Sequence, residues 1–444
     1  MRSYFIETWG CQMNQHDSEL IEGQLREHGM AAASGASDAD LVILNTCSVR
    51  ERPVHKIVSR IGALEKMANS PVIGICGCVA QQEGTELLKR SPSVGFVLGP
   101  GQIGSVSEAI RVVEQGGRKV LIGFDAERDH NFHSIFRKSS TRGMVTVVEG
   151  CNEFCTFCVV PYTRGRELSR PLAKVVEEVR HLASTGLKEV ELLGQTINAY
   201  LCPETGSDFA DLLTEVAAIP GLARVRYVTS HPRHFNRRLI DVLAENPKVS
   251  RYLHLPFQSG ANEILGRMHR RYTREEYLDL VRNLRKVVPD INLSTDVIVG
   301  FPGETEKYFQ QTLDLLQEVR FGQVFAFAFS PRPHTPAAKY DDQIEEAAKM
   351  DRLHRLFALT ERISSELNQE LVGHKLPVLI DGDSRRDRND WQGRGEDNRV
   401  VNFAKCGREG VGDIVDVRIT RAGAHSLVGE RASGDGRLPV FGAA

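Results

Sequence analysis

The first hundred residues alternate short apolar runs with segments of helical spacing. The apolar runs cover residues 4–6, 41–44, 72–75 and 94–98. The segment after the first run carries Leu20, Ile21 and Leu25, which fall on one face of an α-helix. Because strands that alternate with helices usually lie parallel in one sheet, the pattern predicts a small open parallel α/β sheet over residues 1–125.

A polar segment without apolar periodicity, residues 126–141, follows and is interpreted as a linker. The alternation then resumes, and six apolar runs cover residues 144–148, 190–193, 225–229, 252–256, 293–299 and 324–329. Six βα units fit a partial (β/α)6 barrel better than a closed eight-stranded barrel, which needs about 250 residues. A long helical pattern over residues 345–372 closes this central unit, which we place at residues 142–372.

Short β-like runs replace the α/β alternation after residue 372. They cover residues 376–380, 400–403 and 414–419, and a loop of alternating charge lies between the first two, at residues 383–397. Short strands joined by Gly-rich turns are typical of a small barrel. We therefore expect a small antiparallel β-barrel over residues 373–440, and an α/β protein of three units overall.

Composition and charge exclude several classes of protein. Of the 444 residues, 41% are hydrophobic and 26% charged, which are ordinary globular values. The sequence has neither a run near the ~20 apolar residues of a membrane helix nor the start of a leader peptide, so we expect a cytoplasmic protein without membrane contact. The 56 Lys and Arg against 58 Asp and Glu give a net charge of −2. Any nucleic acid must therefore bind a local surface.

Three cysteines follow the first strand of the central unit with the spacing Cys151-x-x-x-Cys155-x-x-Cys158; we call them the core cysteines. Three thiolates this close can hold three corners of a [4Fe–4S] cluster and leave one iron open. Structural zinc usually needs four protein ligands from paired Cys-x-x-Cys units. Because barrel active sites lie on strand-to-helix loops, the spacing predicts a radical S-adenosylmethionine cluster, with zinc and coincidence as alternatives.

Cys11, Cys47 and Cys78 stand at the ends of the first three apolar runs; we call them the sheet cysteines. Neighbouring strands of an open parallel sheet share one crevice at their carboxyl ends, so these thiols are expected to converge on a second cluster. The alternative is that they are ordinary buried cysteines. Cys76 would lie on the same face of an extended strand as Cys78 and is an alternative ligand, although we prefer to regard it as a small buried residue.

Longer motifs around these cysteines are similar to those of one family. They are residues 8–14 (TWGCQMN), 44–50 (LNTCSVR), 77–80 (GCVA), 149–158 (EGCNEFCTFC) and 161–165 (PYTRG). The chain resembles the radical methylthiotransferases over nearly its whole length, and its last unit resembles a TRAM domain, a small RNA-associated barrel. Within the family it is most similar to the MiaB branch, through residues 193–198, 229–232 (TSHP), 254–260 (HLPFQSG), 294–304 and 330–333 (SPRP). Cys76 and His334 depart from the family pattern, which usually has a small residue such as glycine at the first position and glycine at the second.

The resemblance implies an enzyme that converts N6-isopentenyladenosine at position 37, beside the tRNA anticodon, to its 2-methylthio form. A radical is needed because the C2–H bond of adenine is unactivated, and cofactors supply such chemistry. The resemblance further implies two [4Fe–4S] clusters. The one on the core cysteines would bind S-adenosyl-L-methionine and yield a 5′-deoxyadenosyl radical, and the one on the sheet cysteines would carry sulfur. We expect no catalytic side chain beyond the cluster ligands, a low-potential electron donor such as flavodoxin or ferredoxin, and a monomer.

Residues at the strand ends of the central unit are expected to contact S-adenosylmethionine. Phe157 precedes the third core cysteine and could cover the adenine. Gly194 and Gln195 end the second strand and would meet the amino group, whereas Asp296 and Gly300 of the fifth would meet the ribose and adenine. For Gly300 the alternative is a tight loop without a ligand.

Two local groups of basic residues are candidate tRNA contacts. The first is expected to contact phosphates and comprises Arg267, His269, Arg270, Arg271 and Arg274. The second, Arg385, Arg386 and Arg388, is interleaved with aspartates and could be a solvated face. Gln258 and Arg332, in the stretches that favour the isopentenyl branch, are further candidate substrate contacts.

Three other functions remain open. A methylthiotransferase for threonylcarbamoyl-adenosine tRNA or for a ribosomal-protein aspartate would share both clusters. Its substrate carboxylate would need a cation such as Arg332 or Arg164 at the binding wall, whereas an isopentenyl group requires an apolar wall. A non-catalytic iron–sulfur carrier would not require a complete barrel face, and a structural zinc protein would contain no iron or sulfide.

Overall fold

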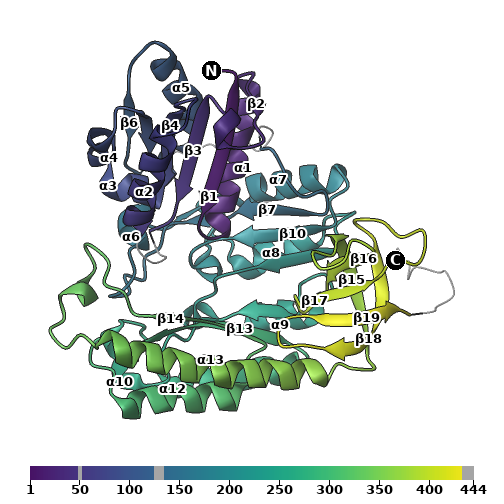
Figure 1. The fold of residues 1–444 in the computed structure, drawn as a ribbon. Helices are drawn as coiled ribbons and strands as arrows, with labels where there is room; N and C mark the ends of the chain where they lie inside the picture. The colour runs from purple at the N-terminus through teal and green to yellow at the C-terminus, as the bar shows by residue number, and fades with distance from the viewer. Residues whose placement is uncertain (49–52, 125–134, 433–444) are drawn as a thin grey trace.

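A computed structural model describes residues 1–48, 53–124 and 135–432 (Figure 1). Its N-terminal part is a six-stranded, wholly parallel sheet of order β2-β1-β3-β4-β5-β6. The strands are β1 (Ser3–Trp9), β2 (Ala31–Ala32), β3 (Leu41–Thr46), β4 (Val72–Gly77), β5 (Val94–Leu98) and β6 (Lys119–Leu121). The four predicted strands are present. The edge strands β2 and β6, of two and three residues, were not predicted.

Helices cover both faces of this sheet because its central strands are apolar on both sides. Ile21 and Ile110 lie in the buried cluster on one face, and Ile57 and Leu87 lie in the cluster on the other. The helices are α1 (Gln12–Glu27), α2 (Pro53–Glu65), α3 (Cys78–Glu83), α4 (Thr85–Arg90) and α5 (Val106–Glu114). The predicted linker, residues 126–141, lies partly outside the described residues.

Six parallel strands form the central core, as predicted, but in two sheets of three. Their orders are β11-β10-β7 and β12-β13-β14, and a bridge between Val225 and Val249 lies where the first sheet gives way to the second. The strands are β7 (Arg142–Thr146), β10 (Glu189–Leu193), β11 (Arg224–Tyr227), β12 (Tyr252–His254), β13 (Asn292–Val299) and β14 (Gln323–Ala328). The first predicted strand is divided, because β8 (Val148–Glu149) leaves the sheet and pairs with β9 (Leu168–Ser169).

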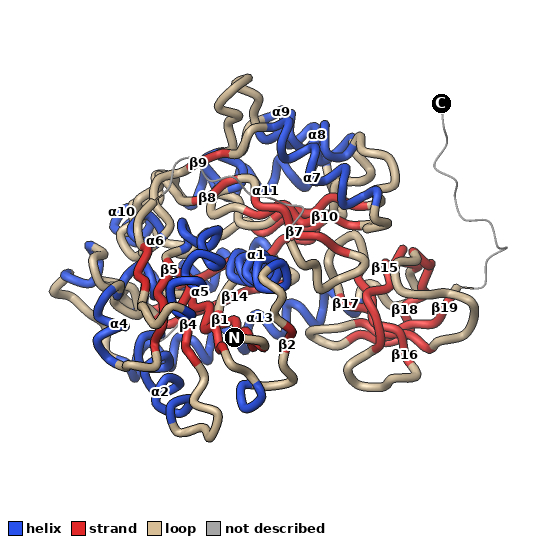
Figure 2. The backbone as a smooth tube through the Cα atoms, turned by 90° about the horizontal axis from the view of Figure 1, so that it is seen from above, coloured by secondary structure: helices blue, strands red, loops and turns tan. Residues whose placement is uncertain are grey.

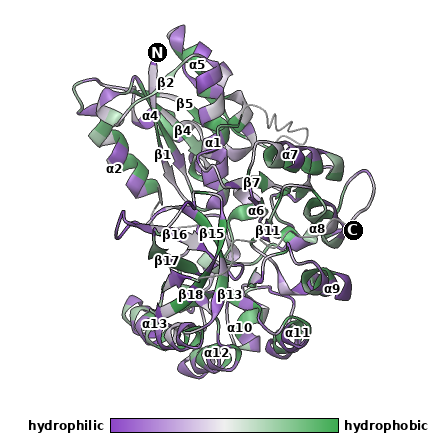
Figure 3. Cartoon of the chain, turned by 90° about the vertical axis from the view of Figure 1, so that its right-hand side faces the viewer, coloured by the Kyte–Doolittle hydropathy of each residue, from purple (hydrophilic) through white to green (hydrophobic). Residues whose placement is uncertain are grey.

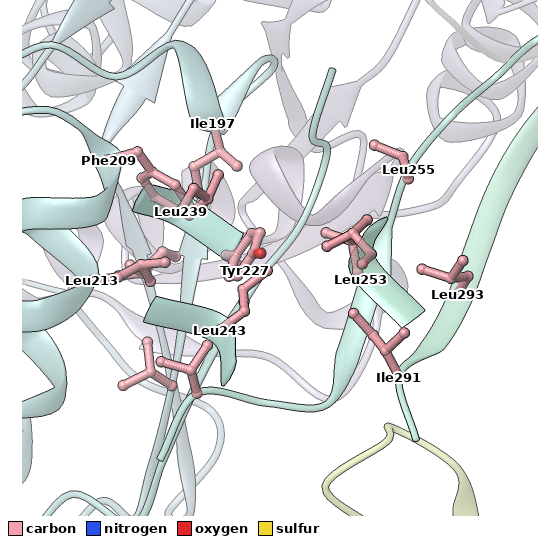
Figure 4. Close-up of a cluster of buried hydrophobic side chains, with 14 of the residues drawn as sticks. Ile197, Phe209, Leu213, Tyr227, Leu239, Leu243, Leu253, Leu255, Ile291 and Leu293 are labelled. Atoms are coloured by element: carbon pink, nitrogen blue, oxygen red, sulfur yellow. The ribbon is translucent and has the colours of Figure 1, made fainter. Parts of the chain in front are cut away.

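Helices surround these strands and bury one continuous core. Figure 4 shows Phe209, Leu213, Tyr227, Leu239 and Leu243 among its side chains. The helices are α6 (Val160–Thr163), α7 (Leu172–Ser184), α8 (Phe209–Ala217), α9 (Arg237–Glu245), α10 (Asn262–Arg267), α11 (Arg274–Val287), α12 (Glu306–Val319) and α13 (Glu346–Gln369). In Figure 3, α11, α12 and α13 lie along the lower edge of the core, each with hydrophilic and hydrophobic stretches. Full burial of each such side chain contributes about 1.5–3 kcal/mol.

The last part of the chain closes into a barrel of order β15-β16-β17-β19-β18. The strands are β15 (Lys375–Asp383), β16 (Asp390–Arg394), β17 (Val400–Ala404), β18 (Ile414–Ala422) and β19 (Leu427–Arg431). The prediction of an antiparallel barrel is wrong in one pairing, because β17 and β19 are parallel. Strands can alternate in direction around a closed ring only if their number is even. Two of the five strands were not predicted: β19, and β16, which lies inside the segment 383–397 that was expected to be a loop.

The N-terminal sheet stands over the end of the core where the carboxyl ends of the core strands lie (Figures 1 and 2). Met13 of α1 packs there against Leu193 and Val228, which end or follow core strands. At the opposite end, the loop between β16 and β17 touches the first residues of the core strands. Arg224 Nη1 donates to Gly395 O at 3.1 Å, and Asn292 Nδ2 donates to Asp397 O at 2.8 Å.

Candidate functional site

The sheet cysteines converge at the carboxyl end of the N-terminal sheet, as expected. Cys11 directly precedes α1, Cys47 follows β3, and Cys78 is the first residue of α3. Hydrogen bonding with the Cys47 thiol lowers the pKa of Cys11 to about 5 and that of Cys78 to about 6, and it raises the pKa of Cys47 itself. Cys47 and Cys78 are buried whereas Cys11 is exposed, so the group opens to one side.

Two glycines and two asparagines allow the sheet cysteines to approach one another. A Cβ at Gly10 would lie 2.9 Å from Cβ of Cys47, and one at Gly77 would lie 2.7 Å from Asn45 Oδ1. Asn14 Nδ2 donates to Asn45 Oδ1 at 3.1 Å, and Asn45 Nδ2 donates to Asn14 O at 2.8 Å. These hydrogen bonds hold the start of α1 beside the end of β3.

Cys76 does not join this group. The expectation that it shares a strand face with Cys78 is wrong, because β4 ends at Gly77, whose φ of +91° turns the chain into α3. The Cys76 side chain is fully buried in an apolar cluster that contains Ile21 and Phe96. Burial raises the pKa of its thiol. The structure therefore favours a core role for Cys76.

The core cysteines lie on the loop between β8 and α6, beside the ends of the neighbouring strands. Cys151 Sγ lies 3.3 Å from Thr196 Oγ1, which follows β10, and accepts from Glu153 N at 3.4 Å. Cys158 N donates to Cys155 O at 3.0 Å, which closes the second half of the loop into a turn. Burial and the neighbouring thiols raise the pKa of Cys158 to about 12. Three thiols thus surround the mouth of the core.

Arg270 supplies a buried cation to the core cysteines. Its Nη1 donates to Cys155 Sγ at 3.5 Å and its Nη2 to Pro256 O at 3.0 Å, and the residue is 6% exposed. This differs from the expected phosphate contact. Both neighbours, His269 and Arg271, have positive φ angles of 61° and 56°, so the backbone turns Arg270 inward while the flanking side chains stay exposed.

A buried ion pair joins the core loop to the N-terminal sheet. Arg164 directly follows α6, and its Nη2 donates to Asp17 Oδ2 of α1 at 2.6 Å. Burial would lower the pKa of Arg164, but Asp17 and the thiols of Cys78 and Cys11 raise it well above its ordinary value. Gln12 Nε2 of α1 also donates to Glu191 Oε1 of β10 at 3.1 Å. The two groups of cysteines therefore lie on facing parts of one interface.

Three family models match successive parts of the chain. They are "Uncharacterized protein family UPF0004" at residues 3–99, the radical SAM superfamily at residues 145–316 and the TRAM domain at residues 369–431. A tRNA-2-methylthio-N(6)-dimethylallyladenosine synthase from Bdellovibrio bacteriovorus is 43% identical over 426 residues, 95% of this chain and 93% of that protein. The chain belongs to the MiaB-type radical SAM methylthiotransferases. A synthase of the same name from Geotalea uraniireducens is 45% identical over 432 residues, 96% of this chain and 98% of that protein.

Solved structures of more distant radical SAM enzymes share the fold. The methyltransferase TsrM from Kitasatospora setae, with cobalamin and a [4Fe-4S] cluster, aligns with a TM-score of 0.54 at 16% identity, over 76% of this chain and 77% of that one. The cobalamin-dependent radical enzyme OxsB aligns with a TM-score of 0.52 at 12% identity, over 82% and 61%. Among the described helices of the methylthiotransferase, none is long and apolar enough to cross a membrane.

Three of the expected cofactor residues, Gly194, Gln195 and Gly300, directly follow strands of the radical SAM core. A Cβ at Gly194 would lie 3.2 Å from Cβ of Val148, so a larger residue would require its neighbours to shift. Gln195 Oε1 is buried and has no hydrogen-bond partner among the described residues. Gly300 has a φ of +68°, and its N donates to Glu304 Oε2 at 2.6 Å. The loop at Gly300 is thus a tight turn with its own internal partner, which keeps the alternative of a ligand-free loop open.

Phe157 and Asp296 point to different surroundings. Phe157 packs against the apolar cluster of Met268 and Phe301, beside α10, instead of lying free over the strand ends. The Asp296 side chain is 31% exposed, with Oδ2 3.4 Å from His254 Nε2. Asp296 therefore remains available at the open side of the core.

Sequence reasoning missed a group in which Glu153 lies between two histidines. His234 Nε2 lies 2.6 Å from Glu153 Oε1, and His231 Nε2 lies 3.8 Å from Glu153 Oε2. Because His231 Nδ1 accepts from Arg233 N at 3.3 Å, the proton of a neutral His231 is on Nε2 and faces the carboxylate. Hydrogen bonding from His234 lowers the pKa of Glu153 to about 2. The arrangement holds the core loop against the end of β11.

The expected tRNA residues are dispersed. Arg267 is paired with Asp342 at 2.7 Å and remains 39% exposed in its side chain. Arg271 is exposed, whereas Arg332 is half-buried. Gln258 is 8% exposed, with a φ of +66°, and its backbone bridges to β13. Arg267 and Arg271 therefore keep a surface position, and Gln258 does not.

Two phenylalanines of β14 are exposed although large apolar side chains are usually buried. Phe325 is 40% and Phe327 50% exposed, while Ala326 between them is 9% exposed. The rings of Phe325 and His254 lie 5.9 Å apart, and His254 also contacts Asp296. The aromatic pair thus adjoins the strand-end residues at the open side of the core.

Proposed function

We propose that this chain methylthiolates C2 of N6-isopentenyladenosine at position 37 of tRNA, beside the anticodon. Its relatives of 42–45% identity over ~96% of the chain carry that activity in their names. The observation that carries the proposal is the pair of three-cysteine groups on facing surfaces, joined by Arg164 and Asp17. One group can serve radical formation and the other sulfur delivery.

The donor sets fit two [4Fe–4S] clusters. Each group offers three thiols, and each has a buried arginine nearby, Arg270 for the core cysteines and Arg164 for the sheet cysteines. Anionic clusters are stabilised by such cations and by hydrogen bonds to their sulfurs. The orphaned Gln195 Oε1 beside the core cysteines is suited to accept from the amino group of S-adenosylmethionine. When bound, the clusters and S-adenosylmethionine supply a 5′-deoxyadenosyl radical and the sulfur that is transferred.

The chain's own residues orient the reactants and exclude water. Cys151, Cys155 and Cys158 anchor one reactant at the mouth of the core. Because Gly194 has no side chain, that reactant can approach the strand ends closely. Asp296 lies at the open side of the core, where it can accept from a ribose hydroxyl. The interface between α1 and the core loop closes the site on the far side. Positioning of this kind converts a bimolecular encounter into a reaction within one complex.

Phe325 and Phe327 form an apolar wall suited to the isopentenyl group. Each buried CH2 or CH3 contributes about 0.8 kcal/mol, so a five-carbon group gains several kcal/mol at such a wall. A threonylcarbamoyl carboxylate would be disfavoured there unless Arg332 turned toward it. Arg267 and Arg271 at the surface are suited to phosphates of the tRNA backbone.

The remaining expectations complete this proposal. Residues 1–125 form the sheet domain, 142–372 the radical core and 373–440 the RNA-associated barrel, with 126–141 as linker. A low-potential electron donor such as flavodoxin or ferredoxin supplies electrons to a monomer in the cytoplasm.

Parallel reactions with three tRNAs test the substrate. The reconstituted protein is supplied with tRNA that carries isopentenyladenosine, unmodified adenosine or threonylcarbamoyl-adenosine, and nucleosides are analysed by mass spectrometry. We expect 2-methylthio product from the first tRNA alone. Preferred turnover of the third would replace the substrate assignment, and no product from any of the three would contradict the proposed activity.

A further inference from the structure

Arg164 carries a buried hydrogen-bond donor that nothing in the described chain uses. The residue is 3% exposed, and its Nη2 is occupied by Asp17. Its Nη1 is buried without a hydrogen-bond partner among the described residues. A buried N–H group of a charged side chain is strongly unfavourable when it stays unpaired, so this atom requires a partner that the described residues do not provide.

After Asp17, the sheet cysteines are the neighbours that influence this guanidinium most strongly, ahead of the carboxylate of Glu149. Asp17 and the sulfurs of Cys78 and Cys11 are close enough for their charges to raise the pKa of Arg164. Arg164 also lies six residues beyond Cys158, on the segment that leaves the core cysteines. Arg164 is therefore part of the core segment in sequence, whereas its guanidinium lies near the sheet cysteines in space.

We propose that Arg164 donates a hydrogen bond from Nη1 to a sulfur atom of the group held by the sheet cysteines. It is a positioning residue: it contributes a fixed positive charge and one directed N–H, and Asp17 holds its orientation. This inference rests on the proposed function, because it requires an iron–sulfur cluster on the sheet cysteines. It adds that the core loop itself tunes and orients the sulfur-delivering half of the site.

The electrostatic role and a merely structural role predict different results. A hydrogen bond or positive charge at a cluster sulfur stabilises the more negative, reduced state and raises the reduction potential. Removal of Arg164 should therefore lower the potential of the sheet cluster, whereas removal of the negative Asp17 should raise it. If the pair merely clamps α1 to the core, both substitutions break the same clamp and should shift the potential in the same direction.

The experiment uses the full chain with the core cysteines replaced by Ala, so that one cluster remains. In that background, Arg164→Met, Arg164→Lys and Asp17→Asn are reconstituted, iron and sulfide are measured, and the midpoint potential is determined by EPR-monitored titration. We expect a lower potential for Arg164→Met, partial recovery for Arg164→Lys and a higher potential for Asp17→Asn. Arg238→Met, an exposed arginine that also pairs with aspartates, is the matched control and should leave the potential unchanged.

Shifts of the same sign in the Arg164→Met and Asp17→Asn variants, or no shift in either, would overturn the inference. If Arg164→Met fails to fold, the opposite signs expected for Arg164→Lys and Asp17→Asn decide the question. A background protein that holds no iron would refute the second cluster, and with it both the proposed function and this inference. Iron that is retained with an unchanged potential would refute the inference alone.

Discussion

Glu189 Oε2 lies 3.0 Å from Arg226 Nη2 at the base of the core, and both side chains are almost fully buried. Arg224 joins the same carboxylate at 3.2 Å. Burial alone would raise the pKa of Glu189, but the charges of Arg226 and Arg224 outweigh it and hold the pKa below its ordinary value. The first residues of β10 and β11 are therefore joined by a charged group that replaces apolar packing.

We expect Glu189→Gln to lower the free energy of unfolding by about 3–5 kcal/mol, because it leaves buried arginines without their anion. Urea denaturation followed by circular dichroism measures the change. Because the folded pKa is depressed, the stabilisation from Glu189 is present above its ordinary pKa and is lost as the pH falls through the lowered value. Glu86→Gln, at an exposed pair with Lys89, should cost about 0–1 kcal/mol. Equal effects of the two substitutions would contradict a buried charge network.

Replacement of all three core cysteines by Ala should remove about half of the bound iron, because one of two equal clusters is lost. Cleavage of S-adenosylmethionine to 5′-deoxyadenosine should stop, since the open iron is gone. Iron analysis and chromatography of the reaction products measure both. Continued formation of 5′-deoxyadenosine would show that the radical cluster lies elsewhere.

Replacement of the sheet cysteines by Ala should separate the two halves of the reaction. S-Adenosylmethionine should still be cleaved when the electron donor is supplied, because the core cysteines are intact, but 2-methylthio product should be absent. Cys76→Ala is the matched control, since the Cys76 side chain lies in the apolar cluster of the same sheet. It should retain both iron and product formation. A loss of iron from the control equal to that of Cys78→Ala would make Cys76 a ligand.

Substitution of the aromatic wall should change substrate preference more than overall folding. In Phe325→Ala with Phe327→Ala, the ratio of kcat/KM for isopentenylated over unmodified tRNA should fall about tenfold or more, equivalent to at least about 1.4 kcal/mol. Phe357→Ala, at a phenylalanine of α13 that is 43% exposed, is the matched control. An unchanged ratio in the double variant would place the isopentenyl group on another surface.

The fold and the positions of the cysteines could be predicted because both follow from local periodicity. The apolar runs show where β1, β3 and β4 end, and parallel pairing then brings Cys11, Cys47 and Cys78 to one edge. β16 was missed because its burial comes from closure of the barrel, which the alternating charges of residues 383–397 do not reveal. β19 was also not predicted, and its parallel pairing with β17 likewise depends on closure of the barrel.

The roles of individual arginines could not be predicted from the local sequence. Arg267, Arg270 and Arg271 are similar in sequence, yet positive φ angles on both sides of Arg270 direct it alone to Cys155. Arg164 likewise stands in a segment of ordinary polarity, and its role depends on the docking of α1 from a distant part of the chain. Such roles depend on tertiary burial, which a single sequence does not encode in any short pattern.

The loop between β16 and β17 fixes the orientation of the C-terminal barrel relative to the core. Because backbone oxygens of Gly395 and Asp397 satisfy Arg224 and Asn292 beneath the core, the barrel cannot swing without uncovering buried polar groups. If the barrel binds the tRNA, as its proposed role requires, the bound RNA is held at a fixed distance and orientation relative to the core. On the proposed function, the fixed distance between barrel and strand ends helps to determine which nucleotide of a bound tRNA reaches the cysteines, and a barrel attached without this loop would present a different one.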